Sequence, residues 1–349
     1  MITKISYIDE NAMDRSVLEE AGSILRSGGL VAFPTETVYG LGANALDEAA
    51  CAGVYLAKGR PSDNPLIVHV SDPEEVLLYA YEDGRGLLRC LMKEFMPGPL
   101  TVVLKKKEMI SDRVTGGLDT VAIRCPSHPV ARELIRVSGV PVAAPSANRS
   151  GRPSPTKAEH VERDMDGRIP MILHGERSAL GLESTIVALR EDGVKLLRPG
   201  FITLEELERV CGKVEVDKAV VTQLAVDESP LAPGMKYRHY APETELIMVD
   251  GEDEAVRSFF AKALTENLGV VCFDEDLAFI SEAAPPDRVI SFGKRGDSLF
   301  QAQGLFSMLR GVDRMGVKKA YVRMPIKDGL GLAVYNRLIK ACGYQLISL

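Results

Sequence analysis

One short stretch of the chain combines residue types that suit anion binding. The apolar residues 140–144 lead into Pro145, and the next six residues are Ser146-Ala147-Asn148-Arg149-Ser150-Gly151. A buried strand that opens into such a loop presents backbone N–H groups and short donors at one point, which suits an anion. The same residue types also occur in loops that only make a bend. Alone, this stretch leaves both interpretations open.

A second stretch contains two cations close together. Lys58 and Arg60 end a helical segment, where positive charges are favourable through the helix macrodipole, and Pro61 forces the chain to extend beyond them. For either cation alone, a role at the helix end is the simpler interpretation. Two fixed positive charges combined with the neutral donors Ser146 and Asn148 suit a polyphosphate, and we therefore expect a phosphate site.

These two stretches resemble the signature of the YrdC-type threonylcarbamoyl-AMP synthases, in which lysine-x-arginine is followed far downstream by serine-x-asparagine. The resemblance covers most of the chain, in the family's order, through 34–42, 97–101, 181–185, 197–200 and 233–242. The last of these stretches is similar to the linker of the two-domain members. Two departures are His174-Gly175-Glu176, where many relatives have an acidic residue followed by glycines, and Ala232, which replaces a common serine.

The resemblance implies a fold and a reaction. The implied fold class is α/β, with a YrdC-like twisted mixed sheet that has a basic concave groove and a small C-terminal Rossmann-like α/β domain. The implied reaction makes L-threonylcarbamoyl-AMP from L-threonine, bicarbonate and ATP, with Mg²⁺ accompanying ATP and with release of pyrophosphate. The product would then pass to a separate tRNA threonylcarbamoyl transferase. No covalent enzyme nucleophile is required, so the lack of an evident Ser-His-Asp or Cys-His set is no objection.

The resemblance also assigns roles that the residues alone leave open. Arg124 ends an apolar strand, where an arginine is either a rim charge or a carboxylate ligand, and the resemblance favours the carboxylate of threonine. The implied catalytic residues are Lys58, Arg60, Ser146 and Asn148. The implied threonine-binding residues are Thr35, Thr37, His69, Arg124, Ala144 and Ser184. The implied ATP-binding residues are Lys58, Arg60, Asn64, Thr120, Ser146, Asn148, Ser154, Arg198 and Tyr237, and no protein metal ligand is expected.

Several of these residues have a structural alternative. His69 lies between two valines and is either a structural histidine or a substrate contact. Thr35, Thr37 and Ser184 stand beside turns, where short hydroxyls cap backbone groups. A pocket for a β-hydroxy amino acid needs such donors, because an unpaired buried polar atom costs about 1–3 kcal/mol. Arg198 ends a strand, and its alternative is a charge in solvent.

Composition narrows the class of protein. With 42 basic and 49 acidic residues the net charge is −7, which argues against broad attraction to nucleic acid, although a local basic groove is compatible with it. The six cysteines are scattered without a C-x-x-C pair, so we expect reduced thiols and neither a zinc site nor a disulfide framework. We find no signal-peptide pattern and no apolar run of membrane length. We expect a cytoplasmic protein without a membrane partner or stable nucleic-acid binding.

Two other function classes stay open as alternatives. A double-stranded RNA-binding module predicts a basic concave face and a steep salt dependence, and the acidic composition argues against it as the main activity. A carbamoyl-transfer domain of the hydrogenase-maturation type would share the fold but would come with zinc-finger and acylphosphatase-like modules, which this sequence does not suggest. The glycine-rich residues 329–334 lack the third glycine of a dinucleotide fingerprint, and we interpret them as a turn that begins a helix.

Hydrophobic periodicity predicts the elements that position these residues. In a catalytic domain of residues 1–215 we expect helices at 14–27, 48–58, 87–95, 129–138 and 203–211, and strands at 30–33, 66–70, 100–104, 120–124, 140–144, 171–173, 185–189 and 194–197. This alternation predicts an α/β sheet, and the β-rich second half predicts a mixed one. Residues 216–243 predict a linker, whose part 233–242, with His239, Tyr237 and Tyr240, is either packed as a spacer or closes over the nucleotide as a lid. Residues 244–349 predict a small parallel sheet with helices on its faces.

Overall fold

The computed structural model describes all residues of 1–349 except 83, 85, 223–231, 233–238 and 281–284. The described chain forms two compact units. One contains Met1–Ser150 and Ser154–Val220, and the other contains residues 239–349 together with Gly151–Pro153 and residues 221–222. The second unit thus includes a three-residue piece from the first half of the chain. No helix in the described part is both long enough and apolar enough to cross a membrane.

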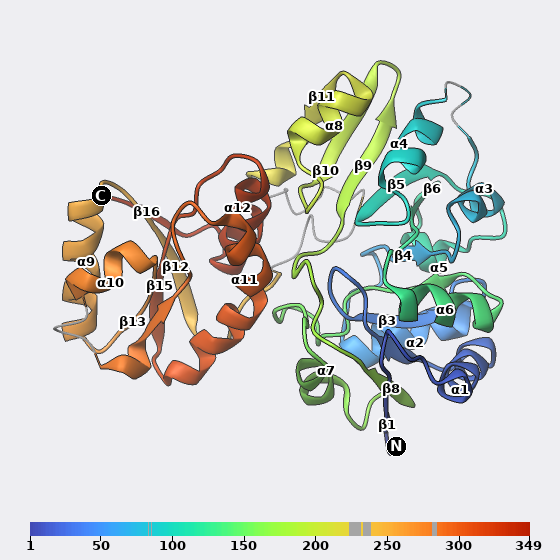
Figure 1. The fold of residues 1–349 in the computed structure, drawn as a ribbon, viewed down its shortest axis with the longest axis horizontal. Coiled ribbons are helices and arrows are strands. Elements are labelled where there is room, and N and C mark those ends of the chain that lie inside the picture. The colour runs from blue at the N-terminus through green and yellow to red at the C-terminus, as the bar shows by residue number, and fades with distance from the viewer. Residues whose placement is uncertain (83, 85, 223–231, 233–238, 281–284) are drawn as a thin grey trace. The chain divides into compact units, whose positions relative to one another are not determined.

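Among its described residues, the first unit forms an eleven-stranded sheet in the order β1-β8-β2-β3-β7-β4-β6-β5-β9-β10-β11 (Figure 1). Its strands are β1 (Lys4–Tyr7), β2 (Val31–Phe33), β3 (Gly40–Asn44), β4 (Ile67–His69), β5 (Leu100–Lys105), β6 (Thr120–Arg124), β7 (Val142–Ala143), β8 (Met171–His174), β9 (Thr185–Arg190), β10 (Gly193–Arg198) and β11 (Val214–Val216). Parallel pairs such as β4 with β6 and antiparallel pairs such as β5 with β6 occur side by side. The predicted mixed α/β sheet is confirmed.

The helices of this unit cover both faces of the sheet. They are α1 (Arg15–Arg26), α2 (Glu48–Lys58), α3 (Val76–Tyr79), α4 (Leu87–Phe95), α5 (Asp112–Thr115), α6 (Pro129–Ser138), α7 (Ala158–Met165) and α8 (Leu204–Cys211), with short 3₁₀ turns η1 (Pro73–Glu75) and η2 (Lys218–Val220). Along β2, Val31 and Phe33 pack in one core with α1 and α6, whereas Ala32 packs in the other core with α2 and α7. This alternation is what a strand buried on both faces requires.

Helix α2 is bounded at both ends by residues that fix its position. Asp47 caps its start by accepting from Ala49 N and Ala50 N, as short acidic side chains do at helix N-termini. Gly59 ends it in the left-handed conformation, with φ of 63°, which glycine adopts without a Cβ penalty. Lys58 is therefore held as the last helical residue, at the point where the chain turns.

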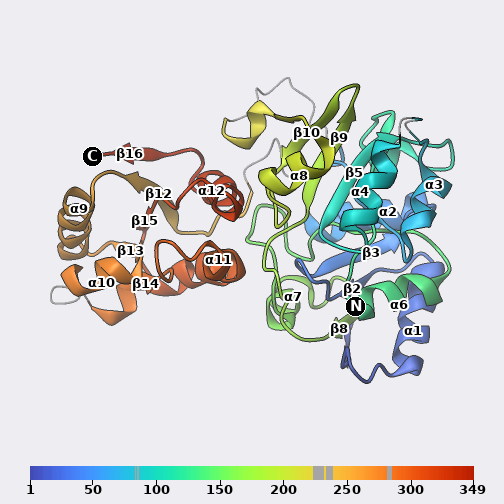
Figure 2. The ribbon, with the colours of Figure 1, turned by 45° about the horizontal axis from the view of Figure 1, so that its top comes forward.

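The second unit forms, among its described residues, a five-stranded sheet in the order β14-β13-β15-β12-β16, with every pair parallel. The strands are β12 (Glu245–Asp250), β13 (Gly269–Cys272), β14 (Val289–Ser291), β15 (Lys319–Arg323) and β16 (Leu346–Ser348). Helices α9 (Asp253–Thr265) and α10 (Asp274–Ile280) cover one face, and α11 (Ser298–Val312) and α12 (Leu330–Ala341) cover the other (Figure 2). Short 3₁₀ turns are η3 (Pro286–Arg288) and η4 (Asp313–Met315). The predicted small parallel sheet is confirmed.

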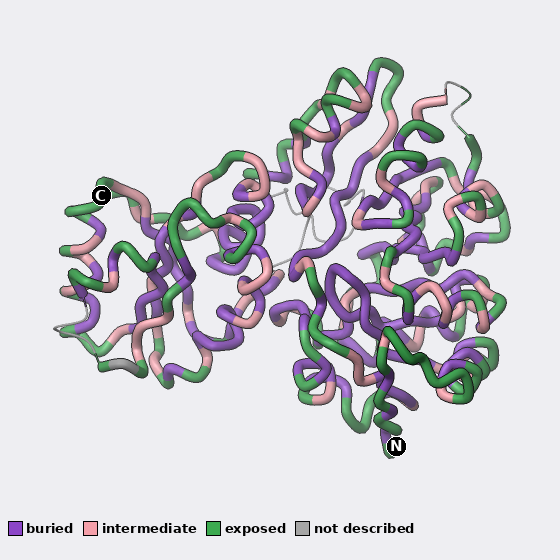
Figure 3. The backbone as a smooth tube through the Cα atoms, viewed as in Figure 1, coloured by how far each residue is buried: buried purple, intermediate pink, exposed green. Residues whose placement is uncertain are grey.

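Burial follows these layers. Figure 3 shows buried residues along the strands and exposed residues in helices such as α1 and α9. The described part of the predicted linker includes Tyr240, which is buried and whose ring lies 5.3 Å from that of Phe306 in α11. Most of the predicted lid, including Tyr237, lies outside the described residues.

Candidate active site

Five neighbouring strands bring predicted site residues to one edge of the first sheet. His69 ends β4 and Arg124 ends β6, and the two are direct neighbours in the parallel register. Strand β5 runs antiparallel to β6, and β9 runs parallel to β5, so both strands begin at this edge. Strand β10 is antiparallel to β9 and ends here with Arg198. Ser184, which directly precedes β9, therefore lies at the same edge as these three side chains.

Arg124 is buried, and three of its nitrogen atoms have partners. Nε donates to the carbonyl of Gly98 at 3.2 Å, and Nη1 donates to Thr37 Oγ1 at 2.8 Å. Nη2 lies 2.7 Å from Glu36 Oε1, which also accepts from Ser127 N at 2.9 Å. The contact with Glu36 is an ion pair, since Nη2 has no hydrogen-bond partner among the described residues, so N–H donors of the guanidinium are left for a further acceptor. A carboxylate is the acceptor that suits this planar group best.

Glu36 is a functional candidate that the sequence analysis missed. Its side chain is only 10% exposed, and its Oε2 has no hydrogen-bond partner among the described residues. Burial raises the pKa of this carboxyl, but the charge of Arg124 and the bond from Ser127 N outweigh burial and hold the pKa below its usual value. Glu36 is thus an anion beside the arginine predicted to bind a carboxylate. The available signal was a single charge between two hydroxyl residues, Thr35 and Thr37.

His69 is buried and neutral. Burial lowers its pKa to about 3, and the positive charge of Arg124 is the second cause. Its Nδ1 lies 3.1 Å from the carbonyl oxygen of Ile67. Because a carbonyl oxygen only accepts, Nδ1 carries the proton and Nε2 is left as an acceptor. The ring can therefore accept a hydrogen bond at this edge without adding charge.

The two predicted threonine hydroxyls form a chain that ends on Arg124. Thr35 Oγ1 donates to the carbonyl of Val38 at 2.6 Å, so Thr37 Oγ1, 2.8 Å away, must donate to Thr35. Thr37 in turn accepts from Arg124 Nη1. The structure therefore brings Thr35 and Thr37 together with Arg124, as the threonine-site prediction requires.

Ser184 lies in a second hydrogen-bonded group. Its Oγ accepts from Arg198 Nη2 at 3.1 Å and lies 2.7 Å from Thr101 Oγ1. Arg198 Nε also donates to the carbonyl of Ser184 at 3.1 Å, and Arg198 itself is only 4% exposed. The alternative in which Arg198 is a solvent charge is therefore wrong. The structure joins a predicted ATP ligand, Arg198, to a predicted threonine ligand, Ser184.

The serine-x-asparagine loop and Lys58 form a third group. Lys58 Nζ donates to the carbonyls of Ser146 and Asn148, each at 2.5 Å. Ser146 Oγ donates to Asn148 Oδ1 at 2.5 Å. Ala144, two residues earlier, is buried and donates its N–H to Ile67, two residues before His69. This backbone bond connects the loop to the edge where Arg124 lies.

Three further ATP-site residues, Arg60, Asn64 and Ser154, have other surroundings. Arg60 donates to the carbonyls of Asn64 and Pro65 at 3.3 and 3.0 Å, and Asn64 Oδ1 is buried without a hydrogen-bond partner in the described chain. Ser154 donates to the buried carboxylate of Glu183 at 2.5 Å, a second acidic residue that sequence reasoning missed.

Thr120 begins β6, at the opposite end of that strand from Arg124, so the structure does not bring the two together. The prediction for Tyr237 lies outside the described residues.

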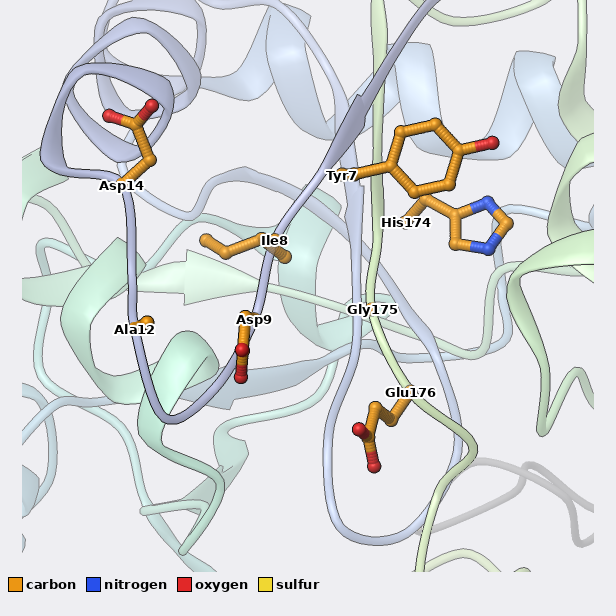
Figure 4. A pocket seen from close by; sticks show the side chains of 8 residues that line it. All are labelled: Tyr7, Ile8, Asp9, Ala12, Asp14, His174, Gly175 and Glu176. Atoms are coloured by element: carbon orange, nitrogen blue, oxygen red, sulfur yellow. The ribbon is translucent and has the colours of Figure 1, made fainter.

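A separate hollow lies where β1 and β8 end. It has a volume of about 590 Å³, and Figure 4 shows the side chains that line it, Tyr7, Ile8, Asp9, Ala12, Asp14, His174 and Glu176, with Gly175. None of them is a predicted site residue. Three of the lining side chains are carboxylates, which would repel a nucleotide. This hollow is therefore distinct from the arginine-rich edge.

Two family models together match nearly the whole chain. The Sua5, YciO and YrdC model, described as telomere recombination, matches residues 23–200, and the model of the threonylcarbamoyl-AMP synthase C-terminal domain matches residues 202–343. The chain belongs to the threonylcarbamoyl-AMP synthase family. This is a family of ATP-using transferases of tRNA modification, so the resemblance and the enzyme class predicted from the sequence are confirmed.

Curated relatives match over almost their full length. The threonylcarbamoyl-AMP synthase of Bacillus subtilis is 44% identical, with 98% of each chain covered, and that of Pyrococcus abyssi is 46% identical, with 94% of each covered. The crystal structure of Pyrococcus abyssi Sua5 complexed with L-threonine has a TM-score of 0.91 and 44% identity, and covers 99% of this chain and 100% of that one. The predicted two-part fold class is confirmed by this match.

Proposed function

We propose that this chain synthesises L-threonylcarbamoyl-AMP from L-threonine, bicarbonate and ATP, with release of pyrophosphate. The observation that supports the proposal most strongly is the joining of Arg124, Thr37 and Thr35 in one buried chain beside neutral His69. A family relative was solved with L-threonine, over nearly the full length of both chains. This arrangement supplies what an α-amino acid with a β-hydroxyl needs, a cation for the carboxylate and short polar groups for the hydroxyl.

The proposed reaction needs positioning and charge stabilisation from the protein. The amine of threonine and bicarbonate give a carbamate with loss of water, and a carbamate oxygen then attacks the α-phosphorus of ATP while the bond to pyrophosphate breaks. Such transfers are accelerated mainly by positioning and charge stabilisation. Lys58, Arg60 and Arg198 form the cationic set of the ATP side, with Mg²⁺ arriving as the counterion of ATP. Ser146, Asn148, Asn64, Thr120, Ser154 and Tyr237 are the polar residues that we assign to the same ligand.

The threonine side is assigned to Arg124, Thr35, Thr37, His69, Ala144 and Ser184. Arg124 would bind the carboxylate with the N–H donors that Gly98 and Thr37 do not use. Ser184 lies against both Arg198 and Thr101, so it is suited to meet threonine where the nucleotide begins. The mixed-anhydride product is reactive, and we place its use in the cytoplasm, by a separate tRNA threonylcarbamoyl transferase.

Pyrophosphate release tests the proposal. We expect pyrophosphate only when ATP, L-threonine and bicarbonate are all present, with each omitted in turn as control. Valine, which lacks the hydroxyl, is the matched substrate control. A site that hydrogen-bonds a substrate hydroxyl rejects the analogue without it by roughly 10⁴–10⁵-fold, because the buried polar groups are left unpaired. Equal turnover of valine would refute the assignment of threonine.

A further inference from the structure

Lys58 is fully enclosed by protein, and burial, together with the nearby charge of Arg60, lowers the pKa of its amino group well below the usual value. Lys58 is only 3% exposed, and its Nζ donates to the carbonyl oxygens of Ser146 and Asn148 at 2.5 Å each. Burying an ammonium is costly unless its protons have acceptors. Two of its three donors are thus used by the backbone of the serine-x-asparagine loop.

A third bond links the same residue to the same loop. Ser150 N donates to the carbonyl of Lys58 at 2.8 Å. Side chain and backbone of Lys58 together therefore hold the loop at its residues 146, 148 and 150. Gly59 fixes the end of α2 immediately after Lys58, so the loop is attached to a rigid helix end.

These bonds also set the direction of the loop's own side chains. Because the carbonyls of Ser146 and Asn148 point at the ammonium, their side chains are left to contact each other, with Ser146 Oγ donating to Asn148 Oδ1 at 2.5 Å. The isolated bridge between Gly40 and Ser146 holds the loop from its other side. The loop is therefore preorganised, with Lys58 as its support.

Arg60, two residues later, is arranged differently. It is partly exposed, and it donates to the carbonyls of Asn64 and Pro65 in its own turn. The two cations of the lysine-x-arginine pair thus have different surroundings. Two of the three N–H donors of the Lys58 ammonium go to the loop carbonyls, so at most one is left for any other acceptor.

From this geometry we infer that Lys58 is a positioning residue, which acts on the nucleotide through the Ser146–Asn148 loop and not by touching the triphosphate. The inference rests on the proposed function, since it takes ATP as the ligand. It divides the lysine-x-arginine pair into a support, Lys58, and a residue that faces the ligand, Arg60. The β- and γ-phosphates therefore play no part in the role of Lys58.

The test compares ATP with AMP, which lacks the β- and γ-phosphates, by calorimetry on the full chain. Lys58→Met should weaken both ligands by the same factor, about 10–100-fold, because the shared loop is disturbed. The matched variant Arg60→Met should weaken ATP more than AMP. Threonine binding, unchanged in both variants, shows that the fold is intact. Loss of ATP affinity in Lys58→Met with AMP affinity retained would overturn the inference.

A measurement on the unaltered chain covers the case in which Lys58→Met does not fold. With lysine labelled by ¹⁵N, the Nζ resonance of Lys58 should shift equally with ATP and with AMP. A shift with ATP alone would show direct contact with the triphosphate and would refute the positioning role. Failure of the unaltered chain to bind either nucleotide would refute the proposed function, and with it this inference.

Discussion

Replacing Glu36 by alanine would leave the buried Arg124 guanidinium without its counterion. The two side chains are only 10% and 5% exposed, and their closest atoms lie 2.7 Å apart. Breaking a buried pair by removing one partner costs about 3–5 kcal/mol, because the other charge stays buried and uncompensated. That is a large share of the roughly 5–15 kcal/mol that stabilises a typical protein. We therefore expect a clear loss of stability in urea unfolding of the Glu36→Ala variant.

A matched control is Glu20→Ala. Glu20 pairs with Lys4 at 2.6 Å, but the side chains of Lys4 and Glu20 are 56% and 45% exposed, and exposed pairs contribute only about 0–1 kcal/mol. Glu36→Gln keeps an acceptor for Ser127 N and should lose less stability than Glu36→Ala. The pKa of Glu36 is held below its usual 4.5, so the folded state favours the ionised form. That contribution is present above pH 4.5 and is lost as the pH falls below it, where the gap between wild type and Glu36→Gln should shrink.

The decisive measurement is the stability that added threonine gives to the variant and to the wild type. In Glu36→Ala the carboxylate of bound threonine replaces the missing counterion, while Gly98 and Thr37 still hold Arg124. A ligand that binds only the folded state adds RT ln(1 + [L]/Kd), about 2.7 kcal/mol at a hundredfold excess over Kd. At one fixed threonine concentration, the variant should gain more stability than the wild type. A smaller gain in the variant, or a loss no greater than that of Glu20→Ala, would refute the reasoning.

Arg124→Ala should abolish most of the threonine affinity, since charge-assisted bonds contribute about 1.5–3 kcal/mol each, while ATP affinity measured by calorimetry stays near wild type; the reverse pattern would contradict the role assigned here. His69 has a pKa of about 3 in the folded chain, so below its usual 6.5 the unfolded state binds a proton that the folded state does not, and stability must fall as the pH drops from 6.5 toward 3. His69→Gln should remove that component, about tenfold in the folding equilibrium constant per pH unit, and an unchanged pH slope would show that the ring is not buried neutral. Gly42→Ala places a Cβ 2.8 Å from Val142 Cγ1 and 2.9 Å from Phe33 Cε1, so thermal unfolding should show a loss of roughly 1–3 kcal/mol, and no loss would mean that the core yields there.

Helices with strong end signals could be predicted from the sequence to the residue. The expected 48–58 and 129–138 coincide with α2 and α6. Each ends at a glycine, Gly59 or Gly139, in the left-handed conformation, and α6 begins with Pro129 at its first position. In both cases local chemistry sets the boundary, so no knowledge of the tertiary structure was needed.

Strand β3 was missed for a physical reason. Its sequence, Gly-Leu-Gly-Ala-Asn, has little of the β-branched or aromatic character that favours strands. The glycine at position 42 is required by packing, because a side chain there would meet Val142 and Phe33. Only the neighbouring strands make that requirement visible. Strands β1 and β14, with four and three residues, were also missed.

The sequence predicted which residues form the candidate site, but not which of their atoms contact one another. Sequence spacing identified Lys58, Ser146 and Asn148 as one group, and the structure brings them together. It could not show that the ammonium faces the loop's carbonyl oxygens, because the direction of a side chain depends on residues far away in the chain. Glu36 was missed for the same reason, since its partner Arg124 lies 88 positions later and only the register of β4 and β6 places that arginine beside His69.

The hydrogen bonds of Gly151 and Pro153 depend on the order in which the ribosome makes the two units of the chain. These residues follow the serine-x-asparagine loop directly, yet their partners are translated much later: Gly151 O accepts from Ala241 N at 2.9 Å, and Pro153 O accepts from Arg310 Nη2 at 2.7 Å, 157 positions downstream. A chain emerging from the ribosome folds its N-terminal part first, so the carbonyls of Gly151 and Pro153 gain these partners only after the second unit has been made. A nascent or shortened chain that ends before Ala241 would therefore have a nearly complete first sheet. Gly151 and Pro153, which lie between the assigned ATP ligands Asn148 and Ser154, would lack these two hydrogen bonds.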